Sequence, residues 1–97
     1  MPIKVYMTNI AGNQLTIGNQ RKVQHILDTN KIEHVDIDLS DPKNGDEKEF
    51  LQRTLTSLNR KMGLPQIFHD EEYCCDYDGI LAAVESNTLN ETLKLKS

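Results

Sequence analysis

Two adjacent cysteines, Cys74 and Cys75, are the only thiols of the chain, and Asp76 follows them. Aspartate is a preferred N-cap residue, so a helix is predicted to begin at this point. A thiol beside a helix N-terminus has a lowered pKa, and the thiolate is the form that exchanges disulfides or is oxidised. Cys75 is therefore the candidate reactive thiol, either for glutathionylation or for sensing oxidation.

A second interpretation of the two cysteines stays open. Successive side chains of a strand point to opposite faces, so one thiol would be buried while the other faces a cleft or solvent. A metal site built from His69, Cys74 and Cys75 would have too few ligands and lacks a Cys-x-x-Cys pair. We therefore predict no metal and no cofactor.

Leu64 and Pro65 form the second feature that could do chemistry, because they precede the apolar run Gln66-Ile67-Phe68. Proline cannot donate a ladder hydrogen bond, so Pro65 must begin a strand or lie at an edge. If its peptide bond is cis, the backbone of Leu64 turns outward and its N–H and C=O are free for a ligand. The candidate ligand-binding residues of a cleft are thus Leu64, Pro65, Cys75 and Asp76.

The elements that must position these residues follow from the spacing of apolar side chains. Residues 3–7 alternate at period two, which predicts a first strand. Residues 9–18 are polar and contain glycines, so we expect a loop leading into a helix that ends near Asn30. Residues 32–39 alternate again and predict a second strand. Its apolar face would carry Val35, Ile37 and Leu39.

A second helix is expected to start at Asp41-Pro42, an N-cap residue before a proline, and to end before Gly63. Its buried stripe would consist of Leu51, Leu55, Leu58 and Met62. Residues 65–75 then predict a hairpin that turns at the polar residues 69–72.

A third helix is expected to follow Asp76 and to stop at Asn87. Its apolar face would carry Ile80, Leu81 and Val84. Thr88 and Glu91 have the spacing of a capping box, which predicts a last helical turn. Leu89 and Leu93 would attach this turn to the core.

Composition excludes several classes of function. A chain of 97 residues predicts one domain, residues 1–97, with one hydrophobic core. The net charge is −4 and no cluster of Lys and Arg is present, so we expect neither nucleic acid nor a membrane as partner. Because the first residues enter a strand pattern without a signal peptide, we expect a cytoplasmic protein. We also expect a monomer.

The predicted order is strand, helix, strand, helix, strand, strand, helix, which a four-stranded mixed sheet flanked by helices accommodates. With a proline opening the third strand, the arrangement resembles the thioredoxin-like fold in its glutaredoxin form. The match to one branch is closer. The motifs Pro65-Gln66-Ile67-Phe68, Tyr73-Cys74 followed by Asp76-Tyr77, and Glu85-Ser86-Asn87-Thr88-Leu89 resemble the SH3-domain-binding glutamic-acid-rich-like family over nearly the whole chain.

The resemblance implies a protein that is not an enzyme. The catalytic Cys-x-x-Cys of a glutaredoxin would fall in residues 9–13, which contain no cysteine. Members of the resembled family generally lack this pair and are regarded as adaptors or modulators of protein interactions, which we expect here. The family name does not carry SH3 binding over to this chain, since Pro65 has no second proline at PxxP spacing.

The resemblance also implies how the cleft would be used. In glutaredoxins the residue before the cis-proline, matched by Leu64, pairs its backbone with glutathione. A Gly-Gly pair followed by a polar or acidic residue holds the gamma-glutamyl end of the tripeptide, and here Cys74-Cys75-Asp76 stand at this element, without the two glycines. Side chains at these positions crowd a close backbone approach, so we expect weak or no glutathione binding, with a peptide as alternative occupant. A glutathione-binding or redox-sensing protein that uses Cys75 is the alternative function.

Overall fold

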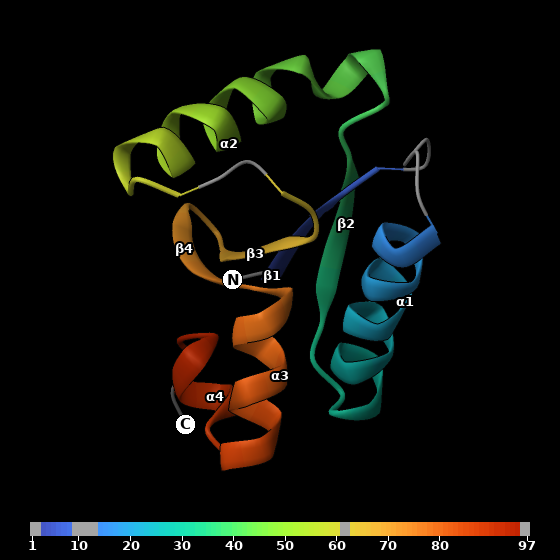
Figure 1. Cartoon of the computed structure of the whole chain (residues 1–97), viewed down its shortest axis with the longest axis vertical. Helices are drawn as coiled ribbons and strands as arrows, with labels where there is room; N and C mark the ends of the chain where they lie inside the picture. The colour runs from blue at the N-terminus through green and yellow to red at the C-terminus, as the bar shows by residue number, and fades with distance from the viewer. Residues whose placement is uncertain (1–2, 9–13, 61–62, 96–97) are drawn as a thin grey trace.

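The computed structural model describes residues 3–8, 14–60 and 63–95. The elements follow in the order β1 (Ile3–Met7), α1 (Gln14–Thr29), β2 (His34–Asp38), the 3-10 turn η1 (Pro42–Asn44), α2 (Gly45–Ser57), β3 (Gln66–His69), β4 (Glu72–Asp76), α3 (Tyr77–Ser86) and α4 (Leu89–Thr92). This confirms the predicted order of strands and helices (Figure 1). None of these helices is both long enough and apolar enough to cross a bilayer.

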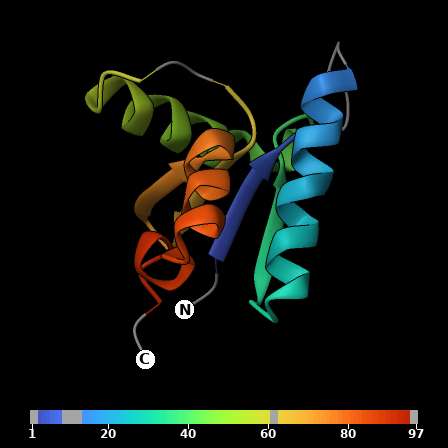
Figure 2. The ribbon, with the colours of Figure 1, turned by 60° about the horizontal axis from the view of Figure 1, so that its bottom comes forward.

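The four strands form one mixed sheet in the order β2-β1-β3-β4. β1 pairs parallel with β2 and antiparallel with β3, and β3 pairs antiparallel with β4. Helix α2 lies on one face of the sheet, whereas α1 and α3 lie on the other (Figure 2). The hairpin between β3 and β4 places the start of α3 next to the entrance of β3.

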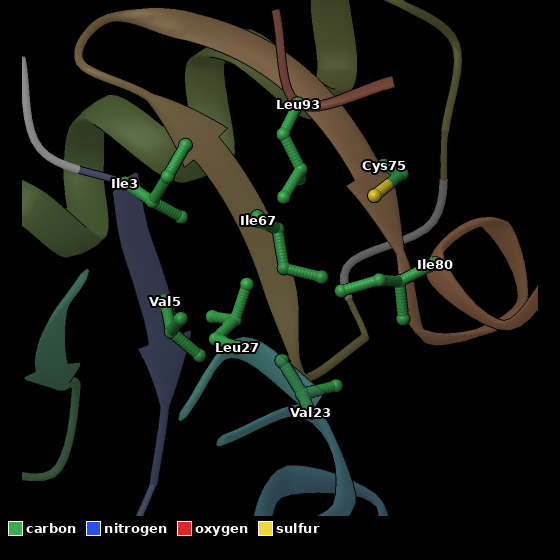
Figure 3. Packing of buried hydrophobic residues seen from close by; sticks show 8 residues of the cluster. All are labelled: Ile3, Val5, Val23, Leu27, Ile67, Cys75, Ile80 and Leu93. Carbon is green, nitrogen blue, oxygen red and sulfur yellow. The ribbon is translucent and has the colours of Figure 1, made fainter. Parts of the chain in front are cut away.

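Each face of the sheet has its own hydrophobic cluster. The larger one joins β1, β3, β4, α1, α3 and the chain after α4 through Ile3, Val5, Val23, Leu27, Ile67, Cys75, Ile80 and Leu93 (Figure 3). The smaller one lies under α2 and contains Tyr6, Ile37, Leu51, Leu55 and Phe68. The predicted attachment of the tail is confirmed, because Leu93 is fully buried and Leu89 packs beside it.

Helix α1 begins four residues before the predicted end of the loop. Gly18 lies within the helix at an exposed position, where the absence of a side chain leaves no gap in the core. Gln20 is buried, and its amide binds the backbone of Thr8 twice: its Oε1 accepts from the Thr8 N–H at 3.0 Å and its Nε2 donates to the Thr8 C=O at 2.9 Å. A polar side chain on the helix thus fixes the end of β1.

Three predicted core positions are instead exposed. Val35 is exposed because β2 is an edge strand that α2 does not cover at that point. Leu58 is the C-cap residue of α2 and lies beyond the helix's contact with the sheet, and Val84 lies on the outer side of α3. Met62, also predicted in the stripe of α2, lies outside the described residues.

The helix ends are partly as predicted. Asn87 ends α3 in the left-handed conformation, with φ of 59°. Asp41 caps η1 by accepting a hydrogen bond from the Lys43 N–H at 3.0 Å. The capping box at Thr88 does not form, since the Thr88 side chain makes no cap bond and its Oγ1 lies 2.8 Å from Ser86 Oγ instead.

Candidate functional site

The peptide bond between Leu64 and Pro65 is cis, and Pro65 is buried directly before β3. The ladder between β1 and β3 ends at Gln66, so Leu64 lies beyond the paired part of the strand. The Leu64 N–H and C=O have no hydrogen-bond partner among the described residues. The backbone of Leu64 therefore has the donor and acceptor that an extended ligand could pair with.

The opposite wall is the junction between β4 and α3. Asp76 is the N-cap of α3, and its Oδ1 accepts a hydrogen bond from the Gly79 N–H at 2.9 Å. Its Oδ2 lies 3.7 Å from the Arg60 Nη1. The Arg60 guanidinium also lies over the Tyr73 ring, 5.1 Å from its centroid. The prediction that Asp76 caps a helix is confirmed, and Arg60 joins this cap to the segment after α2.

Gly79 explains how α3 can begin so close to β4. A Cβ at this position would lie 2.7 Å from the Cβ of Cys75, closer than real Cβ contacts come. A glycine is therefore required where the first turn of α3 crosses the end of β4. The Gly79 N–H at this crossing is the group that Asp76 caps.

A cleft of about 640 Å³ opens between these two walls. Leu64, Pro65 and Gln66 line it from the side of β3, and Asp76, Tyr77 and Asp78 line it from the side of α3. Of the residues predicted to lie at a cleft, Leu64, Pro65 and Asp76 do so, whereas Cys75 does not. The volume suits a short peptide or a small molecule.

Cys75 lies in the core and not at the cleft. Its exposed fraction is 6%, and its sulfur is turned toward the interior that Ile67 and Leu93 fill (Figure 3). Burial, with smaller contributions from Cys74 and Asp76, raises the pKa of the Cys75 thiol to about 12. This is opposite to the lowered pKa predicted from the nearby helix start, because desolvation outweighs the helix dipole.

Cys74 does not point away from Cys75 as strand alternation predicts. Cys75 pairs with Ile67 and Tyr73 pairs with Phe68, so Cys74 is an extra residue in β4 without a partner in β3. This β-bulge changes the alternation, and Cys74 packs against the same cluster that contains Cys75. Burial raises the pKa of the Cys74 thiol as well, although Lys94 opposes the shift.

Gln66 is a cleft residue that sequence reasoning did not identify. Its Nε2 donates to the Gly63 C=O at 2.7 Å, which braces the chain on both sides of the cis peptide bond. Its Oε1 is buried and has no hydrogen-bond partner among the described residues. A polar residue directly after a strand-opening proline was the available signal.

Side chains that could bind a metal are dispersed over the described part of the chain. No group of three or more His, Cys, Asp or Glu side chains there is placed to hold an ion. His34 lies between two carboxylates, with its Nε2 2.9 Å from Asp28 Oδ1 and its Nδ1 3.0 Å from Asp36 Oδ1. These contacts join α1 to the edge strand β2.

Known structures share this architecture. An actin-interacting protein of C. albicans, Aip5, superposes with a TM-score of 0.75 at 22% identity, over 95% of this chain and 87% of that one. Glutaredoxin C1 from Populus tremula x tremuloides superposes with a TM-score of 0.68 at 17% identity, over 96% and 76%. A buckwheat glutaredoxin in complex with glutathione gives a TM-score of 0.68 at 17% identity over the same shares. The fold is thus thioredoxin-like, in its glutaredoxin form.

Sequence comparison is more specific. A Drosophila melanogaster protein described as an SH3 domain-binding glutamic acid-rich protein homolog is 36% identical over 103 aligned residues. The alignment covers 98% of this chain but 65% of the relative, so the chain spans about two thirds of that protein. The family model described as SH3-binding, glutamic acid-rich protein matches residues 1–96. The chain therefore belongs to the SH3-binding, glutamic acid-rich protein family.

Proposed function

We propose that this chain is a non-catalytic protein-interaction domain, a small adaptor or modulator whose cleft beside Pro65 holds a segment of another protein. One observation carries the proposal. The cleft offers a capped helix start and the backbone of Leu64, which has no hydrogen-bond partner among the residues that the structure describes, but neither thiol of the chain lines it. Such a cleft can hold an extended chain by backbone hydrogen bonds, while the group needed for thiol exchange is absent from its walls.

Relatives support a role in protein contacts. The Drosophila melanogaster relative is described as SH3 domain-binding, and the structural neighbour Aip5 as actin-interacting. Both names describe proteins that act by binding other proteins. We do not extend SH3 or actin binding to this chain, because it has no PxxP motif and shares 22% identity with Aip5.

The interaction half of the proposal is tested by photo-cross-linking in cells. Gly63 lines the cleft, and a side chain built there would meet nothing within 4 Å, so a photoreactive residue can replace it. Gly18 on α1 has equally open surroundings and serves as the matched control. We expect discrete adducts from position 63 that excess unlabelled chain suppresses, and none from position 18. No adduct at 63, or equal adducts at both positions, would refute the proposal.

The non-catalytic half is tested by turnover. Reduction of a glutathionylated peptide by glutathione should proceed at the buffer rate in the presence of the chain. The Cys74→Ser, Cys75→Ala double variant should give the same rate. A rate above buffer that the double variant abolishes would show that the chain is an enzyme.

Glutathione binding without chemistry is the second candidate. The likeness to a glutaredoxin solved with glutathione and the cis peptide bond at Pro65 favour it. Asp76 disfavours it, because its carboxylate is already engaged by the helix cap and by Arg60. An amide NMR titration of the reduced chain with glutathione tests this candidate. Saturable shifts at Leu64, Cys75 and Asp76 would establish glutathione as a ligand, and no shifts at millimolar concentration would exclude it.

A further inference from the structure

The charges that line the cleft beside Pro65 do not cancel. Its described lining contains one arginine, Arg60, and two aspartates, Asp76 and Asp78. Arg60 and Asp76 pair with each other, with Nη1 3.7 Å from Oδ2. Asp78 is exposed and forms no ion pair with any residue that the structure describes. The Asp78 carboxylate is therefore the uncompensated charge of this lining, and it is negative.

Gln66 adds an unused hydrogen-bond acceptor to the same cleft. It lines the cleft and is only 5% exposed. The orientation of its amide is fixed, because the Gly63 C=O can only accept and must therefore face Nε2, at 2.7 Å. Oε1 is the other end of this amide, and no donor of the described residues reaches it. A buried acceptor without a partner favours a ligand that brings a donor into the cleft.

The other polar groups of the cleft also suit a ligand rich in donors. Asn19 and Asn59 contribute side-chain amides whose oxygens can accept. A lysine ammonium has three donors and an arginine guanidinium has five, and neither has an acceptor. A carboxylate ligand, by contrast, would meet the unpaired Asp78 and would find Arg60 already engaged. The described lining thus favours a cation over an anion, as does the net charge of −4 at longer range.

We propose that the cleft beside Pro65 binds an extended segment of a partner protein that places a basic side chain against Asp78. The backbone of the segment pairs with the N–H and C=O of Leu64. Its lysine or arginine donates to the Asp78 carboxylate, and Gln66 Oε1 accepts a further N–H of the segment. This inference rests on the proposed interaction function and names the class of partner.

The probe is the peptide acetyl-Ala-Val-Lys-Val-Ala-amide, whose blocked ends leave the lysine as its single charge. Its control has norleucine in place of lysine, which keeps the aliphatic stem and removes the ammonium. In an amide NMR titration, we expect saturable shifts at Leu64, at Asp78 and at the side-chain amide of Gln66 with the lysine peptide. The norleucine peptide should bind about fivefold more weakly, because it lacks the ion pair.

A matched pair of variants assigns the charge effect to one carboxylate. Asp78→Asn should weaken binding of the lysine peptide about fivefold and leave the norleucine peptide unaffected. Asp46→Asn is the control, because Asp46 is also exposed and also the second residue of its helix, but does not line the cleft. It should leave binding of both peptides within about twofold. Both changes preserve side-chain size at exposed positions, and the amide spectrum of each variant verifies its fold.

Several results would overturn the proposal. These are no saturation at millimolar lysine peptide, equal binding of the two peptides, or equal effects of Asp78→Asn and Asp46→Asn. If one of these is found while the Gly63 cross-linker gives specific adducts, the interaction function stands and only the basic side chain is wrong. If the cross-linker also gives none, the proposed function fails as well.

Discussion

The buried Cys75 thiol should be slow to react, and the size of the effect follows from its surroundings. Burial raises its pKa from 9.0 to about 12, which lowers the thiolate fraction at pH 8 by about a thousandfold. A more basic thiolate is a better nucleophile, with a Brønsted slope of about 0.4–0.5, and three pKa units recover roughly 15- to 30-fold. Reaction with a disulfide reagent should therefore be about 30- to 60-fold slower than in the unfolded chain, before restricted access is counted.

The assay uses the Cys74→Ser variant, in which Cys75 is the single thiol. Its reaction with an aromatic disulfide at pH 8 is followed by absorbance, in buffer and in denaturing urea. Because access to a 6% exposed side chain requires opening of the structure, the rate in buffer should rise steeply with low concentrations of urea. Equal rates for the folded and unfolded chain would refute the reasoning and restore Cys75 as a redox sensor.

The same shift has a consequence for stability at alkaline pH. The folded pKa of Cys75 lies above its unfolded value, so its contribution to the free energy of unfolding is complete below about pH 9 and is lost between about pH 9 and 12. Tyr6 and Tyr73, whose pKa values burial also raises, add to the loss above about pH 10. Urea midpoints at pH 8 and pH 10.5 should therefore differ less for Cys75→Ala than for the natural chain. An equal difference would contradict the assignment.

Substitutions at Gly79, Gln20 and Asp76, with Gly18 as a control position, test local packing and capping by urea denaturation. Gly79→Ala should lower the free energy of unfolding by about 1–3 kcal/mol, because the added methyl group meets Cys75 Cβ. Gly18→Ala, in open space, should raise the free energy of unfolding by up to about 1 kcal/mol. Similar effects of the two changes would show that α3 is free to shift. Gln20→Met should cost about 2 kcal/mol through the two lost bonds to the end of β1, and no loss would mean that water replaces the amide. Asp76→Ala should lower the free energy of unfolding by about 1 kcal/mol, and Asp76→Ser should lower it much less, since serine also caps a helix. Equal losses of stability would assign the effect to the ion pair of Asp76 with Arg60 instead.

Local signals in the sequence were sufficient for the order of elements and for three of the four predicted cleft residues. Period-two alternation predicted β1 and β2, and the proline before an apolar run predicted the start of β3. Asp76 was recognised as a cap from its type and position alone. These features depend on residues close together in the chain, where backbone sterics and capping act without help from the rest of the fold.

Tertiary structure decided the environment of the thiols. The sequence placed Cys75 beside a helix start, which favours a thiolate, but only the packing of α3 and the chain after α4 shows that it is desolvated. The bulge at Cys74 follows from the pairing of β3 with β4, and strand alternation within β4 alone cannot reveal it.

Burial of the apolar residues was decided in the same way. Periodicity identifies an apolar side chain but not whether a neighbour covers it, so Val35 at the sheet edge and Leu58 at the end of α2 were expected in the core and are exposed. Gln20 was overlooked for the converse reason, since a buried amide is recognisable only once the backbone groups that it binds are in place. The sequence by itself determined the succession of elements and the position of the cleft. The tertiary structure decided which side chains face that cleft, because exposure and pKa depend on neighbours that are distant in the chain.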